Sequence, residues 1–289
     1  MEFAFTQEQE ELRRQARSFL EANPDAPLPE LRELGWLGVS VPEERGGGGL
    51  SFVDEAILFE EAGRALYAGP FLTTAVVLPA LPEVDDNAWS VELDGLVPHL
   101  DTADMVLRED LSTVAADGET LATVDESRPL GRLATADTEV DDEFEPVRLR
   151  LLAALAAEAV GVAQKALELG VAYVSDREQF GKKIGTYQAV SHPLADTYVE
   201  TELARSLAYW AAWCVAEVDE RTPVAVASAK SFCAETAVTA CERSIQVHGG
   251  IGFTWEHVLH RYYKRAQWID AFGGHAAKQR ELVAAALLD

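Results

Sequence analysis

The sequence predicts a mainly α-helical protein whose C-terminal half is an antiparallel helix bundle. Long apolar helical stretches with short connections run from Val147 to the end of the chain, which is typical of a bundle. Shorter helical stretches occupy residues 1–82. Between them the helical period is lost, and short alternating segments such as "WSVEL" and "TLATV" indicate strands. We therefore expect an N-terminal helical domain (1–82), a shortened acidic β-domain or linker (83–146) and a C-terminal helix bundle (147–289).

The N-terminal helices carry start signals. The segment "TQEQEELRRQARSFLEAN" begins with Thr6 as N-cap and has Gln9 three residues later, which is the spacing of a capping box. Ser51 lies just after the glycine-rich segment "PEERGGGG" and can cap another helix. We expect this second helix to continue to about Leu66.

Charge is distributed unevenly along the chain, whose formal net charge is −25. Residues 83–146 hold 19 of the 49 acidic side chains but only three of the 24 basic ones. They include no lysine, since the first lysine of the chain is Lys165. Such a segment repels phosphates and nucleic acid. Contacts to an anionic ligand must therefore come from the C-terminal half, and we expect no nucleic-acid partner.

Loop, cap and glycine residues indicate where the bundle helices begin and end. The first, "LLAALAAEAVGVAQKALELGVAYVSD", is followed by the loop "REQFGKKIGT" and a second long amphipathic helix. A third helix is expected to have Thr222 as N-cap, with Pro223 at its first position, and to end at "HGG". Two more helices, "WEHVLHRYYKRAQWIDAF" and "HAAKQRELVAAALL", flank the break "AFGGHA". Two adjacent glycines disfavour a continuous helix there by about 1 kcal/mol each.

Targeting and membrane segments are not expected. No basic start followed by an apolar stretch precedes the first helix. The longest uncharged run, residues 65–82, contains three prolines, which argues against a membrane span.

Cysteine and histidine spacing predicts no metal site. Cys214, Cys233 and Cys241 lie in apolar helical stretches without a CxxC spacing. This pattern favours buried thiols in a reducing compartment, and we expect a cytoplasmic protein. His257 and His260 are expected on a solvated helix face rather than as metal ligands.

Three motifs in the bundle could carry chemistry. In "DREQFGK", Arg177 offers donors suited to a phosphate, and Phe180 beside it can cover a planar ring. In "QVHGGIGF", consecutive glycines let a ligand approach backbone N–H groups, and Gln246 can donate and accept hydrogen bonds. The third motif is the "AFGGHA" break. From spacing alone, a solvated basic loop, a helix C-cap and a simple helix junction stay open as alternatives.

Together, these motifs resemble the acyl-CoA dehydrogenase family over almost the whole chain. The resemblance is densest in "GVAQKALELGVAYVSDREQFGKKIGTYQAVSHPLAD" and "SIQVHGGIGFTWEHVLHRYYKRAQ", and "GWLGVSVPEERGGGGLSF" is similar to the family's entry segment. It implies a subunit with an N-terminal helical domain, a middle β-domain and a C-terminal four-helix bundle. It also implies FAD-dependent α,β-dehydrogenation of an acyl-CoA substrate, with electrons passed to an electron-transfer flavoprotein.

The resemblance also implies FAD contacts that one subunit of the family supplies to its neighbour. The matching positions are Arg177 for the pyrophosphate, Phe180 for the aromatic after it, Gln188 after the loop, and Gln246 with Gly249 and Gly250 for a QxxGG turn. The other half of the FAD site, which a subunit's own β-domain supplies, is largely missing. Residues 83–146 are much shorter than that domain and lack its flavin-lining motifs.

The catalytic base of the family is missing as well. In most members a glutamate near the C-terminus removes the α-proton, and its position falls on Gly273. Some members place the base ten residues before the glycine that matches Gly161, which here is Leu151. Neither residue can accept a proton, and Asp270 lies about one helical turn from the first position.

We therefore expect a degenerate subunit of a heteromeric acyl-CoA dehydrogenase. It would pair with a complete homologue in an α₂β₂ heterotetramer and complete the partner's FAD site. Enzymes of this design are known in actinobacterial sterol side-chain degradation, which makes a steroid-CoA thioester a candidate substrate. Two alternatives stay open: a stand-alone dehydrogenase with another base such as Asp270, and a non-catalytic assembly subunit that touches no flavin.

Overall fold

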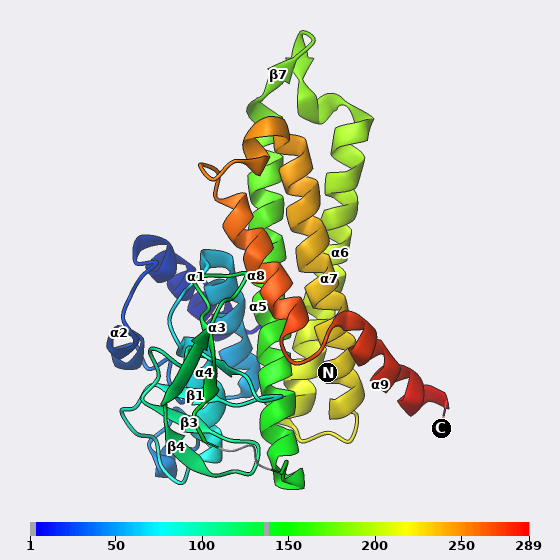
Figure 1. Ribbon diagram of the computed structural model, residues 1–289. Coiled ribbons are helices and arrows are strands. Elements are labelled where there is room, and N and C mark those ends of the chain that lie inside the picture. Colours follow the sequence, from blue (N-terminus) through cyan, green and yellow to red (C-terminus); the bar gives the residue numbers. More distant parts are fainter. Residues whose placement is uncertain (1–3, 136–138, 289) are drawn as a thin grey trace.

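The computed structural model describes residues 4–135 and 139–288 and shows a mainly helical molecule (Figure 1). The long helices of the C-terminal half form a bundle. The N-terminal helices and the short strands lie against one side of its lower half, and the upper half of the bundle extends beyond them (Figure 1). The predicted fold class is therefore confirmed. Within the described ranges, no helix is both long and apolar enough to cross a membrane.

The two N-terminal helices for which the sequence predicts a cap start as expected. Thr6 accepts a hydrogen bond from the Gln9 amide (3.2 Å), and the Gln9 side chain accepts one from the Thr6 amide (3.0 Å), which completes the capping box. Ser51 caps the third helix, which ends just before Leu66. The bounds are α1 (Gln7–Ala22), α2 (Leu28–Glu33), α3 (Phe52–Ala65) and α4 (Phe71–Val77).

The middle segment forms two small three-stranded sheets in the strand orders β1-β3-β4 and β2-β6-β5. The predicted strand in "WSVEL" is confirmed, whereas only the first two residues of "TLATV" are in a strand, because pairing with β6 ends at Leu121. The domain boundaries given above stay a prediction. The bounds are β1 (Trp89–Val91), β2 (Val97–Pro98), β3 (Met105–Leu107), β4 (Thr113–Ala115), β5 (Gly118–Leu121) and β6 (Leu130–Leu133).

The bundle consists of α5, α6, α7 and α8, and the chain changes direction at each connection (Figure 1). A last helix, α9, packs against α7 and points away from the body (Figure 1). The central helix, α5, is completely buried over residues 151–163, where alanines let its neighbours approach closely. The bounds are α5 (Glu145–Asp176), α6 (Gln188–Ala216), α7 (Thr222–His248), α8 (Leu259–Ala271) and α9 (Ala276–Leu288).

Two predicted helix starts were wrong. The N-cap of α7 is Arg221, because the Thr222 hydroxyl donates to the carbonyls of Cys214 and Asp219 instead of accepting from an amide of its own helix. The α8 helix begins at Leu259 rather than near Trp255, because the residues after α7 form a short 3₁₀ turn and a loop before α8 starts.

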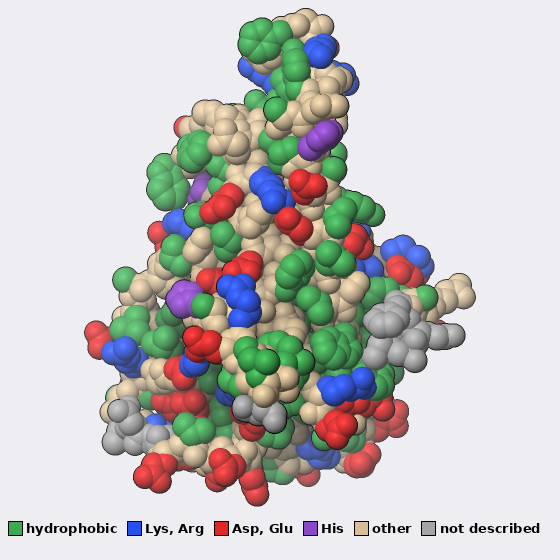
Figure 2. Space-filling view, turned by 90° about the vertical axis from the view of Figure 1, so that its right-hand side faces the viewer, with side chains coloured by type: hydrophobic (Ala, Val, Ile, Leu, Met, Phe, Trp, Pro, Cys, Tyr) green, Lys and Arg blue, Asp and Glu red, His purple; other side chains and the backbone are tan. Residues whose placement is uncertain are grey.

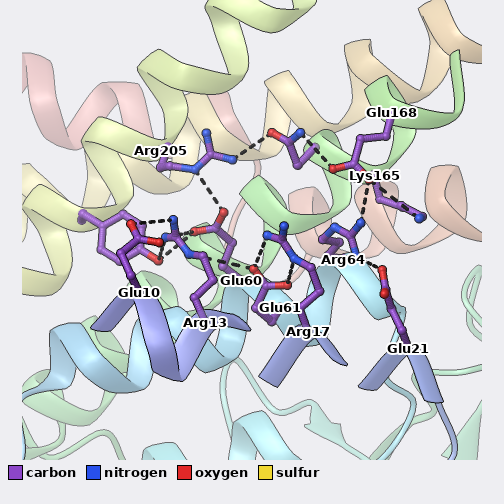
Figure 3. A network of polar contacts seen from close by, with 12 residues as sticks. Glu10, Arg13, Arg17, Glu21, Glu60, Glu61, Arg64, Lys165, Glu168 and Arg205 are labelled. Carbon is purple, nitrogen blue, oxygen red and sulfur yellow. Dashed lines mark hydrogen bonds and ion pairs between the residues drawn. The ribbon is translucent and has the colours of Figure 1, made fainter. Parts of the chain in front are cut away.

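A buried polar network joins the N-terminal helices to the bundle (Figure 3). Glu60 of α3 is 2% exposed and accepts hydrogen bonds from Arg13 of α1 (3.3 Å), Arg205 of α6 (3.0 Å) and Tyr209 (2.7 Å). The neighbouring Glu61 accepts two hydrogen bonds from Arg17 of α1 (2.9 and 2.7 Å). A buried carboxylate needs such partners to offset the loss of water. The network therefore fixes α1 and α3 on the bundle.

A second buried cluster attaches the middle segment to the bundle. Glu158 of α5 accepts hydrogen bonds from Arg128, which lies in the turn before β6, and from Arg265 of α8 (2.7 Å each). Arg265 also pairs with Asp125 of the same turn. All four side chains are buried, and the Arg128 guanidinium lies over the Trp268 ring. The turn is therefore fixed in place against α5 and α8.

Candidate flavin-contacting site

The six candidate contact residues lie where α5 is joined to α6 and where α7 ends, and the label of β7 marks this end of the bundle as the upper one in Figure 1. Arg177 follows the last residue of α5, and Gln188 is the first residue of α6. The other four lie on the connecting hairpin or at the end of α7. All six are solvent-exposed: Arg177, Phe180, Gln188, Gln246, Gly249 and Gly250.

A two-residue hairpin presents Phe180 to solvent. The strands β7 (Glu178–Gln179) and β8 (Lys182–Lys183) pair antiparallel, and Phe180 and Gly181 between them have φ values of 53° and 79°. Two left-handed residues in a row form the tight turn that suits the twist of a hairpin. Phe180 is 93% exposed at its tip, so its ring is available to a neighbouring molecule.

At the end of α7, the backbone is open to close approach by a ligand. Gly249 is the C-cap of α7 with φ 64°, a conformation that favours glycine. A Cβ atom built at Gly249 or at Gly250 would meet no other atom within 4 Å. The turn continues as a 3₁₀ segment, Gly249–Phe253. A ligand can therefore reach the backbone of this turn without obstruction from the chain itself.

An aromatic contact brings the two halves of the site together. His248, the residue before Gly249, stacks on Tyr173 with ring centroids 4.2 Å apart. The carbonyl of Tyr173 accepts the Arg177 amide at the end of α5 (2.9 Å). Arg177 and the glycine turn are far apart in the chain but each lies within one helical turn of this pair.

The charges at this end suit an anionic group. In the part of the chain that the structure describes, the Arg177 side chain forms no hydrogen bond or ion pair, so its five donors are available. Lys182 and Lys183 lie on the same hairpin. Acidic side chains gather instead at the opposite end of the molecule (Figure 2). A free guanidinium and an open glycine turn at the same end of the bundle are a fitting donor set for a pyrophosphate.

Comparison with known proteins assigns the fold to a family. The acyl-CoA dehydrogenase N-terminal domain matches residues 6–82, and the acyl-CoA dehydrogenase C-terminal domain matches residues 150–288. The acyl-CoA dehydrogenase IpdE2 of Mycobacterium tuberculosis (strain ATCC 25618 / H37Rv) is 34% identical over 252 residues, which cover 81% of this chain and 77% of IpdE2. The chain belongs to the acyl-CoA dehydrogenase family. Its members are oxidoreductases that typically bind FAD.

Two solved structures have the same fold. The ChsE4-ChsE5 complex from Mycobacterium tuberculosis superposes with a TM-score of 0.85 at 22% identity, over 100% of this chain and 99% of that one. The Tcur3481-Tcur3483 steroid ACAD superposes with a TM-score of 0.80 at 27% identity, over 97% of each chain.

Gly273, onto which the sequence resemblance places the catalytic glutamate of most family members, lies in a tight backbone turn. Gly273 lies between α8 and α9 with φ 72°, at the end of α8 that is remote from the candidate contacts. A Cβ atom there would lie 2.5 Å from Cδ2 of Leu152. The "AFGGHA" segment is therefore a helix junction, as one of the alternatives above states, and has no room for a longer side chain without rearrangement.

The structure also describes the surroundings of the two other candidate positions for a base. Leu151 is completely buried in the main hydrophobic core. Asp270 accepts hydrogen bonds from His275 (2.9 Å) and from the amide of Ala276 (3.2 Å), so each of its oxygens is hydrogen-bonded at the start of α9. Asp270 thus stabilises the helix junction.

A cavity of about 540 Å³ adjoins Gly273, and among its ionisable lining residues the acidic side chains outnumber the basic ones. Burial, together with the neighbouring carboxylates, raises the pKa of Glu109. Phosphates of a coenzyme A ester would be repelled at this opening. The ionisable lining residues are Asp94, Glu109, Asp141, Asp142, Glu145, Arg148 and Lys278.

The structure also tests the predictions for the cysteines and for His257. The three cysteines are buried free thiols, as predicted. The prediction for His257 was wrong, because His257 precedes α8 and its ring packs 4.4 Å from that of His248 instead of lying on a solvated helix face. Among the residues that the structure places, no three His, Cys, Asp or Glu side chains are arranged to hold a metal ion.

Proposed function

We propose that this chain is the subunit of a heteromeric FAD-dependent acyl-CoA dehydrogenase that lacks its own catalytic base. It would pair with a complete homologue, in an α₂β₂ heterotetramer, and complete the FAD site of that partner. The observation that carries the proposal is the contrast between the two ends of the molecule. One end exposes six candidate contact residues, whereas the position of the base is Gly273 in a tight turn.

Each contact residue has a role that its geometry supports. Arg177 would pair with the pyrophosphate, since its guanidinium has no other partner among the described residues. The open backbone at Gly249 and Gly250 would receive the neighbouring part of the dinucleotide, with hydrogen bonds from Gln246 and Gln188. Phe180 would cover a planar ring. The bound FAD supplies the hydride acceptor for the dehydrogenation, in the active site of the partner.

The comparisons support both the partner and the substrate class. Two of the structures with the same fold are named as pairs, the ChsE4-ChsE5 complex and the Tcur3481-Tcur3483 steroid ACAD. We infer an acyl-CoA substrate, with a steroid side-chain CoA thioester as the first candidate. An electron-transfer flavoprotein would reoxidise the flavin. The buried free thiols favour a reducing compartment, and we propose the cytoplasm.

Co-expression with a complete homologue tests the proposal. We expect an equimolar complex that contains one FAD per two chains and dehydrogenates acyl-CoA, whereas this chain alone should contain no flavin and show no turnover. Full flavin content and turnover in a homo-oligomer of this chain would contradict the proposal and favour the stand-alone enzyme.

Arginine variants separate the proposal from a scaffold role. Arg177→Ala should lower the FAD content of the complex without changing the subunit ratio. The matched control is Arg221→Ala, since Arg221 is another exposed arginine but lies between α6 and α7 and is paired with Asp219. Unchanged FAD content in Arg177→Ala would favour the non-catalytic assembly subunit.

A further inference from the structure

The loop that follows the glycine turn is fixed to the bundle by two histidines. At its start, His248 stacks on Tyr173 of α5. At its end, Nδ1 of His257 accepts a hydrogen bond from the amide of Leu259, the first residue of α8 (3.2 Å). The rings of His248 and His257 pack against each other with centroids 4.4 Å apart. Both ends of the segment 249–258 are therefore joined through one pair of imidazoles.

The hydrogen-bond partners fix where each imidazole carries its proton. The Ser244 carbonyl, 2.6 Å from Nδ1 of His248, can only accept, so this nitrogen is protonated. The Leu259 amide can only donate, so Nδ1 of His257 must be unprotonated. Protonation of His248 at its other nitrogen leaves its bond intact. Protonation of His257 at Nδ1 removes the bond to Leu259.

The surroundings of His257 disfavour a positive charge. Burial, followed by the nearby His248 and His260, lowers the pKa of His257. The N-terminal end of α8, which carries a partial positive charge, lies directly beside the ring. Among the described residues, no carboxylate forms an ion pair with His257. The titratable groups that face this loop are Tyr173 from α5, His248 from α7, and His260 and Lys264 from α8.

We propose that His257 is a positioning residue for the Gly249–Gly250 turn. Its neutral imidazole joins the start of α8 to the end of α7 and so holds the turn in the conformation that leaves its backbone open. Protonation breaks the bond to Leu259, places a cation against His248 and loosens the turn. The consequence for flavin binding rests on the proposed function, whereas the positioning role concerns this chain alone.

Hydrogen exchange of the chain tests the positioning role directly. After correction for intrinsic rates, exchange of the amides in 249–262 should increase between pH 7.5 and pH 5.5, by at most about fivefold, which corresponds to the complete loss of one capping hydrogen bond. His257→Asn keeps an acceptor at both pH values, so this increase should disappear. His257→Leu has no acceptor and should exchange rapidly at both.

His192→Asn is the matched control, because His192 is an exposed histidine near the start of α6 and lies at the same end of the bundle. It should respond to pH as the unmodified chain does. Circular dichroism at both pH values would establish that every variant is folded. An unmodified loop that is equally protected at both pH values would overturn the proposal, and so would a pH response that persists in His257→Asn.

The heteromeric complex separates this inference from the proposed function. There, FAD retention should fall at pH 5.5 in the unmodified complex and should fall less in the complex with His257→Asn. If amide exchange of the loop increases as expected while FAD retention is unchanged at pH 5.5, the proposed contact between the turn and FAD is wrong and the positioning role stands.

Discussion

Gly161 of α5 packs against Glu60 of α3 so closely that a Cβ atom at Gly161 would lie 1.8 Å from the Glu60 carbonyl oxygen. The contact is reciprocal one turn away, where a Cβ atom at Gly63 would lie 2.2 Å from the carbonyl oxygen of Glu158. Two glycines thus let two helix backbones meet. This crossing places Glu60 and Glu158, the centres of the two buried networks, on adjoining helices.

Gly161→Ala should destabilise the protein by about 3 kcal/mol, because α3 and α5 must separate to admit a methyl group. In an unconstrained helix the same change would be stabilising. Urea unfolding of the unmodified chain and of Gly161→Ala measures the difference in their free energies of unfolding. Gly250→Ala is the control for stability, since a Cβ atom there meets no neighbour within 4 Å. Equal midpoints for the two variants would contradict the close crossing.

Glu158→Gln should cost about 3–5 kcal/mol, because it leaves Arg128 and Arg265 buried without their shared carboxylate. The control is Glu235→Gln, which breaks the exposed pair between Glu235 and Arg280 and should change stability little. Denaturant unfolding compares the two variants. If they lose equal stability, the buried cluster does not attach the middle segment to the bundle.

Gly273→Glu should not create dehydrogenase activity in this chain alone, and it should lower the melting temperature. The new side chain would need a left-handed backbone and would meet Leu152. Ala271→Glu adds the same charge at an exposed position nearby and should melt normally. Turnover with an acyl-CoA in the isolated Gly273→Glu chain would show that a flavin pocket is present after all.

His99 should make the protein less stable in mild acid. It is 3% exposed, and burial, with Arg128 and Arg265 nearby, holds the pKa of its imidazole well below the usual range. The unfolded chain therefore binds a proton that the folded chain does not as the pH falls below about 6.5. Stability should be constant above this pH and decrease below it.

The variant His99→Asn should reduce this decrease, since asparagine does not titrate and tolerates the left-handed backbone of this position. Urea unfolding at pH 7.5, 6.5 and 5.5 gives the slope of the unfolding free energy against pH. His192→Asn removes an exposed histidine and should leave the slope unchanged. If both variants have the slope of the unmodified chain, His99 does not cause the acid sensitivity.

Local signals in the sequence were sufficient for much of the fold. Thr6 and Ser51 cap their helices as predicted, because a capping bond joins residues two or three positions apart. The helical period also predicted the bundle. Thr222 was mispredicted as an N-cap because the partners of its hydroxyl, the carbonyls of Cys214 and Asp219, belong to the preceding turn.

The candidate site was predictable as a set of motifs and not as an arrangement in space. Arg177 and Gly249 were each identified by resemblance, but the sequence does not contain the contact between Tyr173 and His248 that joins them. Helix packing decides which residues of α5 and α7 face each other. It likewise decided that His257 packs on His248, although the residues around it read as a continuous helix.

The sequence by itself therefore determined the helices, their caps, the acidic middle segment and the absence of a carboxylate at Gly273, since each depends on near neighbours or on residue type alone. Only the tertiary structure decided that Gly161 lies against Glu60 and that Arg128 and Arg265 share Glu158. Those contacts join residues that are distant in the chain, and they form because buried charges need partners and close helix crossings need glycine.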